Sequence, residues 1–418
     1  MKRFFLLLAL ALPLAACGPR ETLVPLPAGI EDNLYRTGVN TNPYEYFPQA
    51  ETPVPAGYKP FYISHYGRHG SRSDWGGPHY EKVIEAYTRA HEAGVLTEEG
   101  EKAFGMIQEI YRLHNDMNGR LTPRGAREHR AIAGRMYDKY KDVFKSGKVR
   151  AVSSTVPRCI VSMAACTGEI LSRNPRQDIG WDTGERFMEY CSSNDPWDVT
   201  QEAYKLIMEH AESVEPDTVC FASRVFTDMD AARAAIGHSM KEALEGTMAF
   251  AAISGAFDQD ETLLNLFDVK DLEHYARNVS LNLFLRQCNS AEFGDRRMAV
   301  AEVGNFVDDV IAKADEAIAG GPVAVDLRFG HDYQLLAVCS RIGIQGIGER
   351  LTKEEAVNWP GWLYSPFAGN LQMIFYRNAA SEVLVKFYIN ERETGLLGLE
   401  GGPYYKWEDV KQAWKPNE

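Results

Sequence analysis

The sequence lacks the signature motifs of several large enzyme classes. It contains neither the G-x-S-x-G turn of serine hydrolases nor the G-x-x-x-x-G-K-[ST] loop that binds nucleotide phosphates. No CxxC pair or Cys/His cluster has the spacing of a zinc site, and the DQD sequence at residues 258–260 lacks the glycine and the spaced carboxylates of a calcium loop. These absences exclude serine-hydrolase and P-loop chemistry, and they predict that the protein uses no metal and no cofactor.

Basic charge is also scarce. The 418 residues include 45 Lys and Arg against 58 Asp and Glu, which gives a net charge of −13. A nucleic-acid-binding protein would need a basic face, so we expect no nucleic-acid partner. One locally basic pocket could still hold an anionic small molecule, because a cleft focuses the field of the groups that line it. The length suits one large bilobed domain or two to three smaller ones, and the chain has no internal repeat.

Long hydrophobic runs are missing except near the N-terminus, where the run at residues 4–14 is too short for a stable transmembrane helix. Two basic residues precede this run and LAAC at residues 14–17 ends it, an order that resembles a bacterial lipoprotein signal. We expect residues 1–16 to be a cleaved signal peptide, Cys17 to carry lipid and residues 17–33 to form a tether. This predicts an exported lipoprotein attached to the membrane, in the periplasm or at the outer-membrane surface. An ordinary signal peptide with an incidental cysteine is the alternative.

The chain has seven cysteines, an even six of which remain if Cys17 is lipidated. An exported protein meets conditions that permit disulfides. Cys159 and Cys166 lie in one predicted helix, about 10 Å apart by helical rise, which is too far to bridge. Otherwise the sequence leaves the pairing open among Cys159, Cys166, Cys191, Cys220, Cys288 and Cys339.

Three short β-prone runs each end in a polar cluster and lead into a helical pattern. The runs cover residues 61–66, 149–154 and 323–329. RHGSR at residues 68–72 follows the first run, Arg158 follows the second, and GHD at residues 330–332 follows the third. Strand, turn and helix in this order predict an α/β fold with a mostly parallel sheet flanked by helices. Ligands of such sheets bind beyond the carboxyl ends of the strands, where all three clusters are expected.

The middle of the chain has a different pattern. Helical patterns dominate at residues 201–213, 227–254, 262–288 and 296–318, whereas two further strands are expected at residues 371–376 and 383–389. We therefore predict an all-helical lobe at residues 166–295, inserted into an α/β core formed by residues 34–165 and 296–418.

The three clusters together suit the binding and transfer of a phosphoryl group. Arg68 and Arg72 place guanidiniums, whose forks match phosphate oxygens, on either side of His69, and histidine can accept a phosphoryl group covalently. In the same interpretation, Arg158 supplies a third guanidinium, His331 a further hydrogen-bond donor to phosphate, and Asp332 a carboxylic acid. Each piece alone has a structural alternative, because RHG can be a turn with a buried ion pair and an aspartate can cap a helix. Their convergence at three strand ends favours function.

These motifs resemble those of the histidine acid phosphatases, the second branch of the histidine phosphatase superfamily. LTPRG at residues 121–125, and SSTVPR at residues 153–158 with Ser162, resemble further segments of that family, and the resemblance runs in order from about Lys59 to Asn390. PFAGNL at residues 366–371 is similar to the multiple inositol polyphosphate phosphatase group. That group usually has His-Ala-Glu where this chain has His331 and Asp332, the form typical of classical acid phosphatases and phytases.

The resemblance implies a metal-free phosphomonoester hydrolase with a phosphohistidine intermediate. His69 would attack phosphorus, while the non-bridging oxygens are held by Arg68, Arg72, Arg158 and His331. Asp332 would protonate the leaving alcohol and then activate water. A neutral histidine beside a protonated aspartate predicts a bell-shaped pH profile with an acid-to-neutral optimum.

The substrate has to be inferred from residues outside the three clusters. Inositol polyphosphates such as phytate carry many charges, and Lys59, Arg124, Arg127 and Arg130 are candidate outer contacts, as are His65 and His129. A solvated helix face is the alternative for these residues. The competing functions are a broad-specificity acid phosphatase on sugar or nucleotide monophosphates and a non-catalytic phosphate-binding lipoprotein. A phosphomutase of the same superfamily fits the insertion and the export signal poorly, and the sequence leaves the oligomeric state open.

Overall fold

The computed structural model describes residues 29–74, 78–114, 117–192, 197–294 and 302–415. The expected signal peptide, Cys17 and most of the expected tether lie outside these ranges. Residues 29–33 of the tether already belong to the fold, since Ile30 is buried and the Arg36 side chain donates to the Gly29 carbonyl. Within the described part of the chain, every helix is too short or too polar to span a bilayer.

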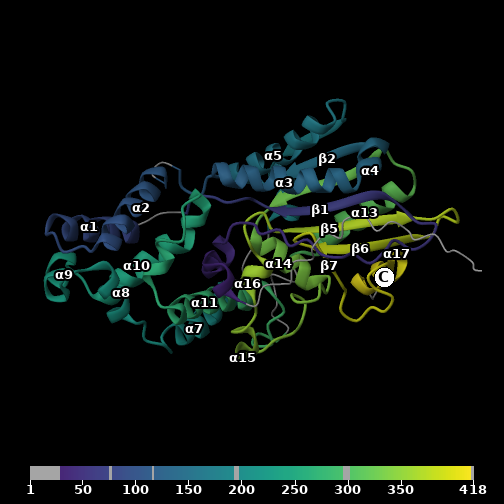
Figure 1. Cartoon of the computed structure of the whole chain (residues 1–418). Coiled ribbons are helices and arrows are strands. Elements are labelled where there is room, and N and C mark those ends of the chain that lie inside the picture. Colours follow the sequence, from purple (N-terminus) through teal and green to yellow (C-terminus); the bar gives the residue numbers. More distant parts are fainter. Residues whose placement is uncertain (1–28, 75–77, 115–116, 193–196, 295–301, 416–418) are drawn as a thin grey trace, which may run out of the picture.

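One mixed sheet forms the α/β layer of the protein (Figure 1). Its strand order is β3-β2-β4-β1-β5-β6-β7, and β8 pairs with β6. The strands are β1 (Lys59–Arg68), β2 (Lys148–Ser153), β3 (Ile179–Thr183), β4 (Val323–Gly330), β5 (Asn370–Arg377), β6 (Val383–Ile389), β7 (Arg392–Thr394) and β8 (Tyr405–Lys406). Parallel pairing joins β1, β2, β3 and β4, whereas β5 to β8 pair antiparallel. The α/β fold class is confirmed, and all five predicted strands are present.

The strand register brings the three polar clusters to one edge of the sheet. Arg68 at the end of β1 pairs with Gly330 at the end of β4, and Ser153 at the end of β2 pairs with Phe329. The parallel strands β1, β2 and β4 therefore end level with one another. The loops that follow them begin side by side, as the sequence predicted.

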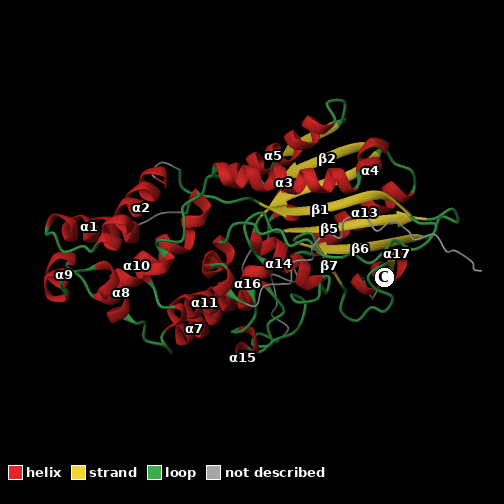
Figure 2. Cartoon of the chain, viewed as in Figure 1, coloured by secondary structure: helices red, strands yellow, loops and turns green. Residues whose placement is uncertain are grey.

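Helices cover both faces of the sheet (Figure 2). Side chains alternate between the two faces of β1, so Ile63 packs into one core cluster while Tyr62 and Tyr66 pack into the other. The helices on the Ile63 face are α3 (Pro123–Lys139), α4 (Lys141–Ser146) and α5 (Pro157–Arg173). Those on the Tyr62 face include α7 (Trp197–Ala211), α13 (Gly304–Ile318), α14 (Asp332–Arg341) and α17 (Trp407–Trp414).

A third core cluster lies in a helical lobe beside the sheet, at the opposite end of the molecule from α17 (Figure 1). The lobe consists of α1 (Pro78–Glu92), α2 (Glu98–His114), α8 (Thr218–Val225), α9 (Met229–Ile236) and α10 (Met240–Ile253). Helix α11 (Val269–Gln287) joins the lobe to the core, because Leu272 packs into the lobe cluster and Phe284 into the Tyr62 cluster. The shorter helices are α6 (Met188–Cys191), α15 (Lys353–Ala356) and α16 (Gly361–Tyr364).

The lobe differs from the predicted insertion at residues 166–295 in three ways. Helix α7 lies within that range yet packs on the Tyr62 face of the sheet. Strand β3 lies within that range yet pairs with β2 in the sheet, and α1 and α2, which the prediction placed in the core, pack in the lobe cluster. Only Ile179 of β3 is buried, so an edge strand of this kind carries almost no hydrophobic alternation in its sequence. The predicted helix at 227–254 is divided into α9 and α10 by Gly237, whose φ of 74° ends α9.

All six cysteines in the described residues are unpaired. Five are buried, whereas Cys220 is half-exposed. The sequence left the pairing of these cysteines open, and the structure shows no disulfide among them.

Two buried histidines couple the stability of the fold to pH. The rings of His65 and His129 pack against Phe329, at centroid distances of 5.7 and 5.5 Å. Burial, with smaller contributions from His129 and Arg328, lowers the pKa of His65 to about 3, and burial lowers the pKa of His129 to about 4. Because both side chains lie inside the core, neither fits the predicted role of an outer substrate contact.

Acidification is therefore expected to destabilise the protein. An unfolded histidine titrates near pH 6.5, so the unfolded chain binds more protons than the folded one between that pH and the lowered pKa of His65. Stability is lost as the pH falls through this window, and His65 alone should account for about 2–3 kcal/mol of the loss at pH 4.5. Urea unfolding of His65→Gln at pH 6.5 and 4.5 should show a smaller drop than the wild type. An identical drop would contradict this assignment.

Candidate active site

The loop that follows β1 is fixed by backbone hydrogen bonds on both sides. The Arg68 N–H donates to the Gly369 carbonyl at 2.8 Å, and the His69 N–H donates to the Gly330 carbonyl at 2.9 Å. The His69 carbonyl accepts the Ala368 N–H at 2.9 Å. His69 is therefore held between the end of β4 and the segment that precedes β5, and it is only 1% exposed.

The same loop packs against the first turn of α3 through two glycines. A Cβ atom on Gly70 would lie 2.4 Å from the Gly125 carbonyl oxygen, and one on Gly125 would lie 2.3 Å from the Ser71 carbonyl oxygen. The Thr122 side chain accepts from the Gly125 N–H at the start of α3 and donates to the Ser71 carbonyl. Glu128, one turn further on, accepts from both the N–H and the hydroxyl of Ser71.

Gly125→Ala should displace the loop and reduce activity. Alanine favours helices, but at this position its methyl group would meet backbone atoms that cannot rotate away. We expect a loss of about 1–3 kcal/mol in the free energy of unfolding and at least a roughly tenfold loss in kcat/KM. Gly168→Ala is the matched control, because Gly168 lies in α5 with open space around its Cβ position. Full activity in Gly125→Ala would contradict this account.

The His69 imidazole is oriented by its own backbone. Its Nδ1 lies 3.0 Å from the Gly70 carbonyl oxygen, so Nδ1–H donates there and the lone pair remains on Nε2. Burial lowers the pKa of His69 well below its usual value, and Arg68, Arg158 and Arg72 lower it further. The lowered pKa favours the neutral imidazole, whose Nε2 carries the free lone pair.

Three guanidiniums surround this ring. Arg68 is fully buried, donates to the Ser365 carbonyl at 2.9 Å and lies 4.8 Å from the centroid of the Phe367 ring. Arg72 lies 5.9 Å from the same ring. Burial, together with Arg72 and Arg158, lowers the pKa of Arg68 to about 10, although Asp332 acts in the opposite direction. Cations that destabilise one another in this way favour a bound anion of high charge.

His331 connects the second and third clusters. Its ring lies 5.7 Å from that of His69 and stacks on Tyr333 at 4.9 Å. Arg158 Nη2 lies 3.3 Å from Nδ1 of His331, and Ser154 Oγ lies 3.2 Å from Nε2. Because a guanidinium can only donate, Nδ1 is the acceptor and Nε2–H donates to Ser154. Burial, reinforced by Arg158, lowers the pKa of His331 to about 3, so the ring holds Arg158 as a neutral acceptor.

Asp332 begins α14 and faces the guanidinium of Arg68. Its Oδ2 lies 3.1 Å from Arg68 Nη2 and accepts from Asn40 Nδ2 at 2.9 Å, while Oδ1 accepts the Tyr333 N–H at 3.1 Å. Burial would raise the pKa of Asp332, but Arg68 and the Asn40 hydrogen bond lower it to about 2. Asn40 and Glu128 were missed by the sequence analysis, because neither belongs to a motif.

The structure thus brings together Arg68, His69, Arg72, Arg158, His331 and Asp332. The outer candidates are scattered. Lys59 begins β1, nine residues before Arg68, and is about 30 Å away along the strand, so its predicted contact with a ligand at His69 does not fit. Arg124 and Arg127 lie in the first turns of α3 beside the loop, and both contact Asp258, at 3.4 and 2.6 Å. Arg130 is exposed on the same helix.

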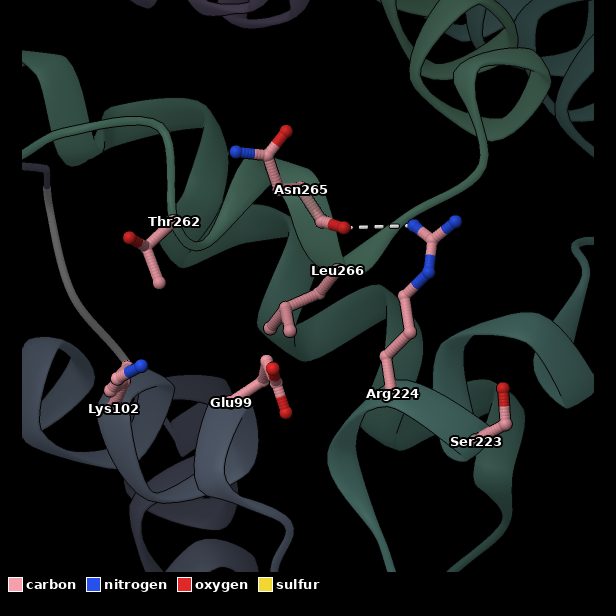
Figure 3. A pocket seen from close by; sticks show the side chains of 7 residues that line it. All are labelled: Glu99, Lys102, Ser223, Arg224, Thr262, Asn265 and Leu266. Atoms are coloured by element: carbon pink, nitrogen blue, oxygen red, sulfur yellow. Dashed lines mark hydrogen bonds between the residues drawn. The ribbon is translucent and has the colours of Figure 1, made fainter.

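A separate hollow of about 540 Å³ lies in the helical lobe (Figure 3). It is lined by Glu99, Lys102, Ser223, Arg224, Thr262, Asn265 and Leu266. Arg224 donates to the backbone carbonyls of Asn265 and Phe267, so this guanidinium caps the short 3₁₀ helix η5 (Leu264–Leu266). None of the six clustered residues lines the hollow.

The described residues offer no group of three or more His, Cys, Asp or Glu side chains that could hold a metal ion. The positive charge near His69 comes from the guanidiniums of Arg68, Arg158 and Arg72.

Comparison with known proteins supports the fold. No protein-family model matches the sequence, and no curated protein matches it. The structure is similar to that of Bifidobacterium longum multiple inositol polyphosphate phosphatase in complex with inositol hexasulfate, with a TM-score of 0.70, 16% identity and coverage of 91% of this chain and 97% of that one. It is also similar to the phytase from D. castellii (TM-score 0.65, 14% identity, 95% and 88% coverage) and to Hafnia alvei phytase (0.53, 10%, 86% and 97%). The chain therefore has the fold of these inositol polyphosphate phosphatases and phytases, as its motifs led us to expect.

Proposed function

We propose that the protein is a phosphomonoester hydrolase that works through a phosphohistidine at His69. The observation that carries this proposal is the neutral His69 ring, tied at Nδ1 and surrounded by the guanidiniums of Arg68, Arg72 and Arg158. Asp332, the only acid proposed for the reaction, is ion-paired to one of these guanidiniums.

In the first step, the Nε2 lone pair of His69 forms a bond to phosphorus while the bond from phosphorus to the alcohol oxygen breaks. Arg68, Arg72 and Arg158 stabilise the charge on the non-bridging oxygens. His331 holds Arg158 through Nδ1, and it would serve as a further phosphate donor only by turning its Nε2–H from Ser154 to the substrate. The Asp332 proton passes to the leaving oxygen. In the second step, water attacks phosphorus, Asp332 takes a proton from that water, and His69 is released with inorganic phosphate.

Substrate binding itself would cause Asp332 to take up from solvent the proton that the first step needs. In the free protein, the guanidiniums keep the pKa of Asp332 at about 2. A phosphate dianion that binds between the same guanidiniums offsets their positive charge and so raises the pKa of Asp332. Asp332 would thus become an acid only when a phosphomonoester is present.

The pH profile of kcat, measured at saturating substrate, should be bell-shaped with an acid-to-neutral optimum, because kcat reports the pKa values of the enzyme–substrate complex. Activity falls at low pH when His69 and the substrate become protonated, and at high pH when Asp332 in the complex loses its proton. Initial rates across the pH range, with and without a chelator, measure this. An optimum well above neutrality together with dependence on magnesium would overturn the assignment.

We further propose that the substrates are inositol polyphosphates such as phytate. The proteins of similar fold are named for such substrates, and one of them is described with inositol hexasulfate bound. Arg124 and Arg127 add positive charge beside the loop that carries His69.

Phosphate release from phytate and from glycerol 2-phosphate, with products resolved by anion exchange, tests both the hydrolase activity and the substrate class. We expect faster turnover of phytate, and a higher KM for phytate alone in the variants Arg124→Ser and Arg127→Ser. Faster turnover of the simple ester would indicate a broad-specificity acid phosphatase. Binding of phosphate without any release would indicate a non-catalytic binding protein.

We also propose that the protein is an exported lipoprotein attached through Cys17, on the strength of the LAAC sequence at residues 14–17. Metabolic labelling with a radioactive fatty acid should mark the wild type and leave Cys17→Ser unlabelled. Labelling of both proteins would refute it.

A further inference from the structure

The carboxylate of Asp332 is held by a residue that comes from far away in the chain. Asn40 Nδ2 donates to Asp332 Oδ2 at 2.9 Å, the same oxygen that faces Arg68 Nη2 at 3.1 Å. The two residues are 292 positions apart in the sequence. Asn40 lies in the 3₁₀ helix η2 (Leu34–Thr41), next to the helical lobe.

Residues 34–45, here called the strap, are fixed by hydrogen bonds directly after Asn40. The Thr41 hydroxyl donates to the Ala252 carbonyl of α10 at 2.9 Å. The Asn42 carbonyl accepts the Phe367 N–H at 2.9 Å, and the Tyr44 N–H donates to Glu128 at 3.1 Å. The strap therefore joins the helical lobe to the two segments that hold the His69 loop.

The backbone next to Asn40 is strained. Val39 has φ 50° and ψ −93°, a left-handed conformation that a β-branched residue adopts at a cost of about 1–3 kcal/mol. Its side chain is fully buried, and a Cβ atom on Gly361 of α16 would come within 2.8 Å of Val39 Cγ1. Packing of Val39 against α16 thus maintains this backbone conformation. The conformation in turn sets the direction in which the neighbouring Asn40 side chain leaves the backbone.

We propose that Asn40 is a positioning residue for Asp332, which holds Oδ2 so that Oδ1 is the oxygen that exchanges a proton with the leaving alcohol. The inference rests on the proposed function of Asp332 as the acid. Arg68 is shared with the substrate phosphate in that mechanism, so its hold on Oδ2 weakens when substrate binds. The amide of Asn40 carries no charge to attract phosphate and keeps its hydrogen bond to Oδ2 through the reaction.

Removal of this hydrogen bond should change the proton affinity of Asp332. A donor to the ionised carboxylate stabilises that form, so Asn40→Ala should raise the pKa of Asp332, and Asn40→Asp should raise it further by placing a like charge beside it. The other charged or titratable groups that act on Asp332, or on which it acts, are Arg68, Arg72, Arg158, Cys159, His331 and Tyr333.

The test compares two leaving groups in stopped-flow and quenched-flow experiments. Nitrophenyl phosphate needs no acid in the first step, whereas glycerol 2-phosphate does. For Asn40→Ala we expect a phosphorylation rate roughly 10- to 100-fold lower with glycerol 2-phosphate, a nitrophenol burst within about twofold of the wild type, and a basic limb of the pH profile moved to higher pH. Asn40→Asp should move this limb further in the same direction.

Thr41→Val is the matched control, because it removes a hydrogen bond that fixes the strap without touching Asp332. It should leave both the leaving-group ratio and the basic limb unchanged. Equal losses with both substrates in Asn40→Ala, an unmoved limb, or the same changes in Thr41→Val would overturn the inference. A His69→Ala variant that still turns over nitrophenyl phosphate, or an Asp332→Asn variant without discrimination between leaving groups, would instead overturn the proposed function.

Discussion

Replacement of His69 by alanine is expected to abolish the turnover of every phosphomonoester, with a loss in kcat on the order of 10⁴-fold or more. The guanidiniums of Arg68, Arg72 and Arg158 would remain to bind phosphate, but no other nucleophile faces phosphorus in the proposed mechanism. Loss of catalysis should therefore occur without loss of phosphate binding. Phosphate release and equilibrium binding of inorganic phosphate, measured on the same preparation, separate the two.

His65→Gln is the control for this variant. His65 is a buried histidine of β1, four residues before His69, whose ring packs against Phe329 and not against the guanidiniums. It should retain most of the wild-type kcat at neutral pH. If His69→Ala still released phosphate at a substantial fraction of the wild-type rate, direct attack by water would replace the covalent mechanism.

Asp332→Asn is expected to lower the phosphorylation rate with an alkyl phosphate by about 10²- to 10⁴-fold relative to the rate with nitrophenyl phosphate. The amide cannot give a proton to an alkoxide, so phosphorylation by an alkyl phosphate should nearly stop. Nitrophenolate leaves without a proton, so its burst should persist, followed by slow turnover because the second step has lost its base. Pre-steady-state rates with nitrophenyl phosphate and glycerol 2-phosphate measure this directly.

Asp74→Asn provides a carboxylate control from the same neighbourhood. Asp74 accepts from Arg72 at 3.4 Å and from the Tyr80 hydroxyl at 2.9 Å, and it is not a proton donor in the proposed mechanism. Any loss in this variant should affect both leaving groups alike. Equal losses on both substrates in Asp332→Asn would remove Asp332 from the acid role.

The sequence was sufficient to predict the sheet and the central cluster because their signals are local. Each buried parallel strand is a short apolar run followed at once by its functional residues, so Arg68 and Asp332 could be assigned to strand ends without knowledge of the fold. Parallel pairing then brings those ends together. The fold class could be predicted for the same reason.

The contacts that tune the site could not be predicted, because they depend on packing between distant segments. Asn40 reaches Asp332 from a strap with no motif, and the Gly125 carbonyl meets Gly70 only once α3 is placed on the loop. Lys59 was chosen for its charge and its closeness in sequence, yet an extended strand carries it away from His69. The place of α1 and α2 in the helical lobe likewise depends on which apolar faces meet.

The most direct test of the account is to trap the phosphoryl group on the protein. The wild type, mixed rapidly with nitrophenyl phosphate and quenched in alkali, in which phosphohistidine is stable, should gain one phosphoryl group by intact mass. Peptide fragmentation should place that group on His69, and Asp332→Asn should accumulate more of it. Quenched samples that turn over substrate but carry no phosphoryl group, or carry it on another residue, would contradict the account.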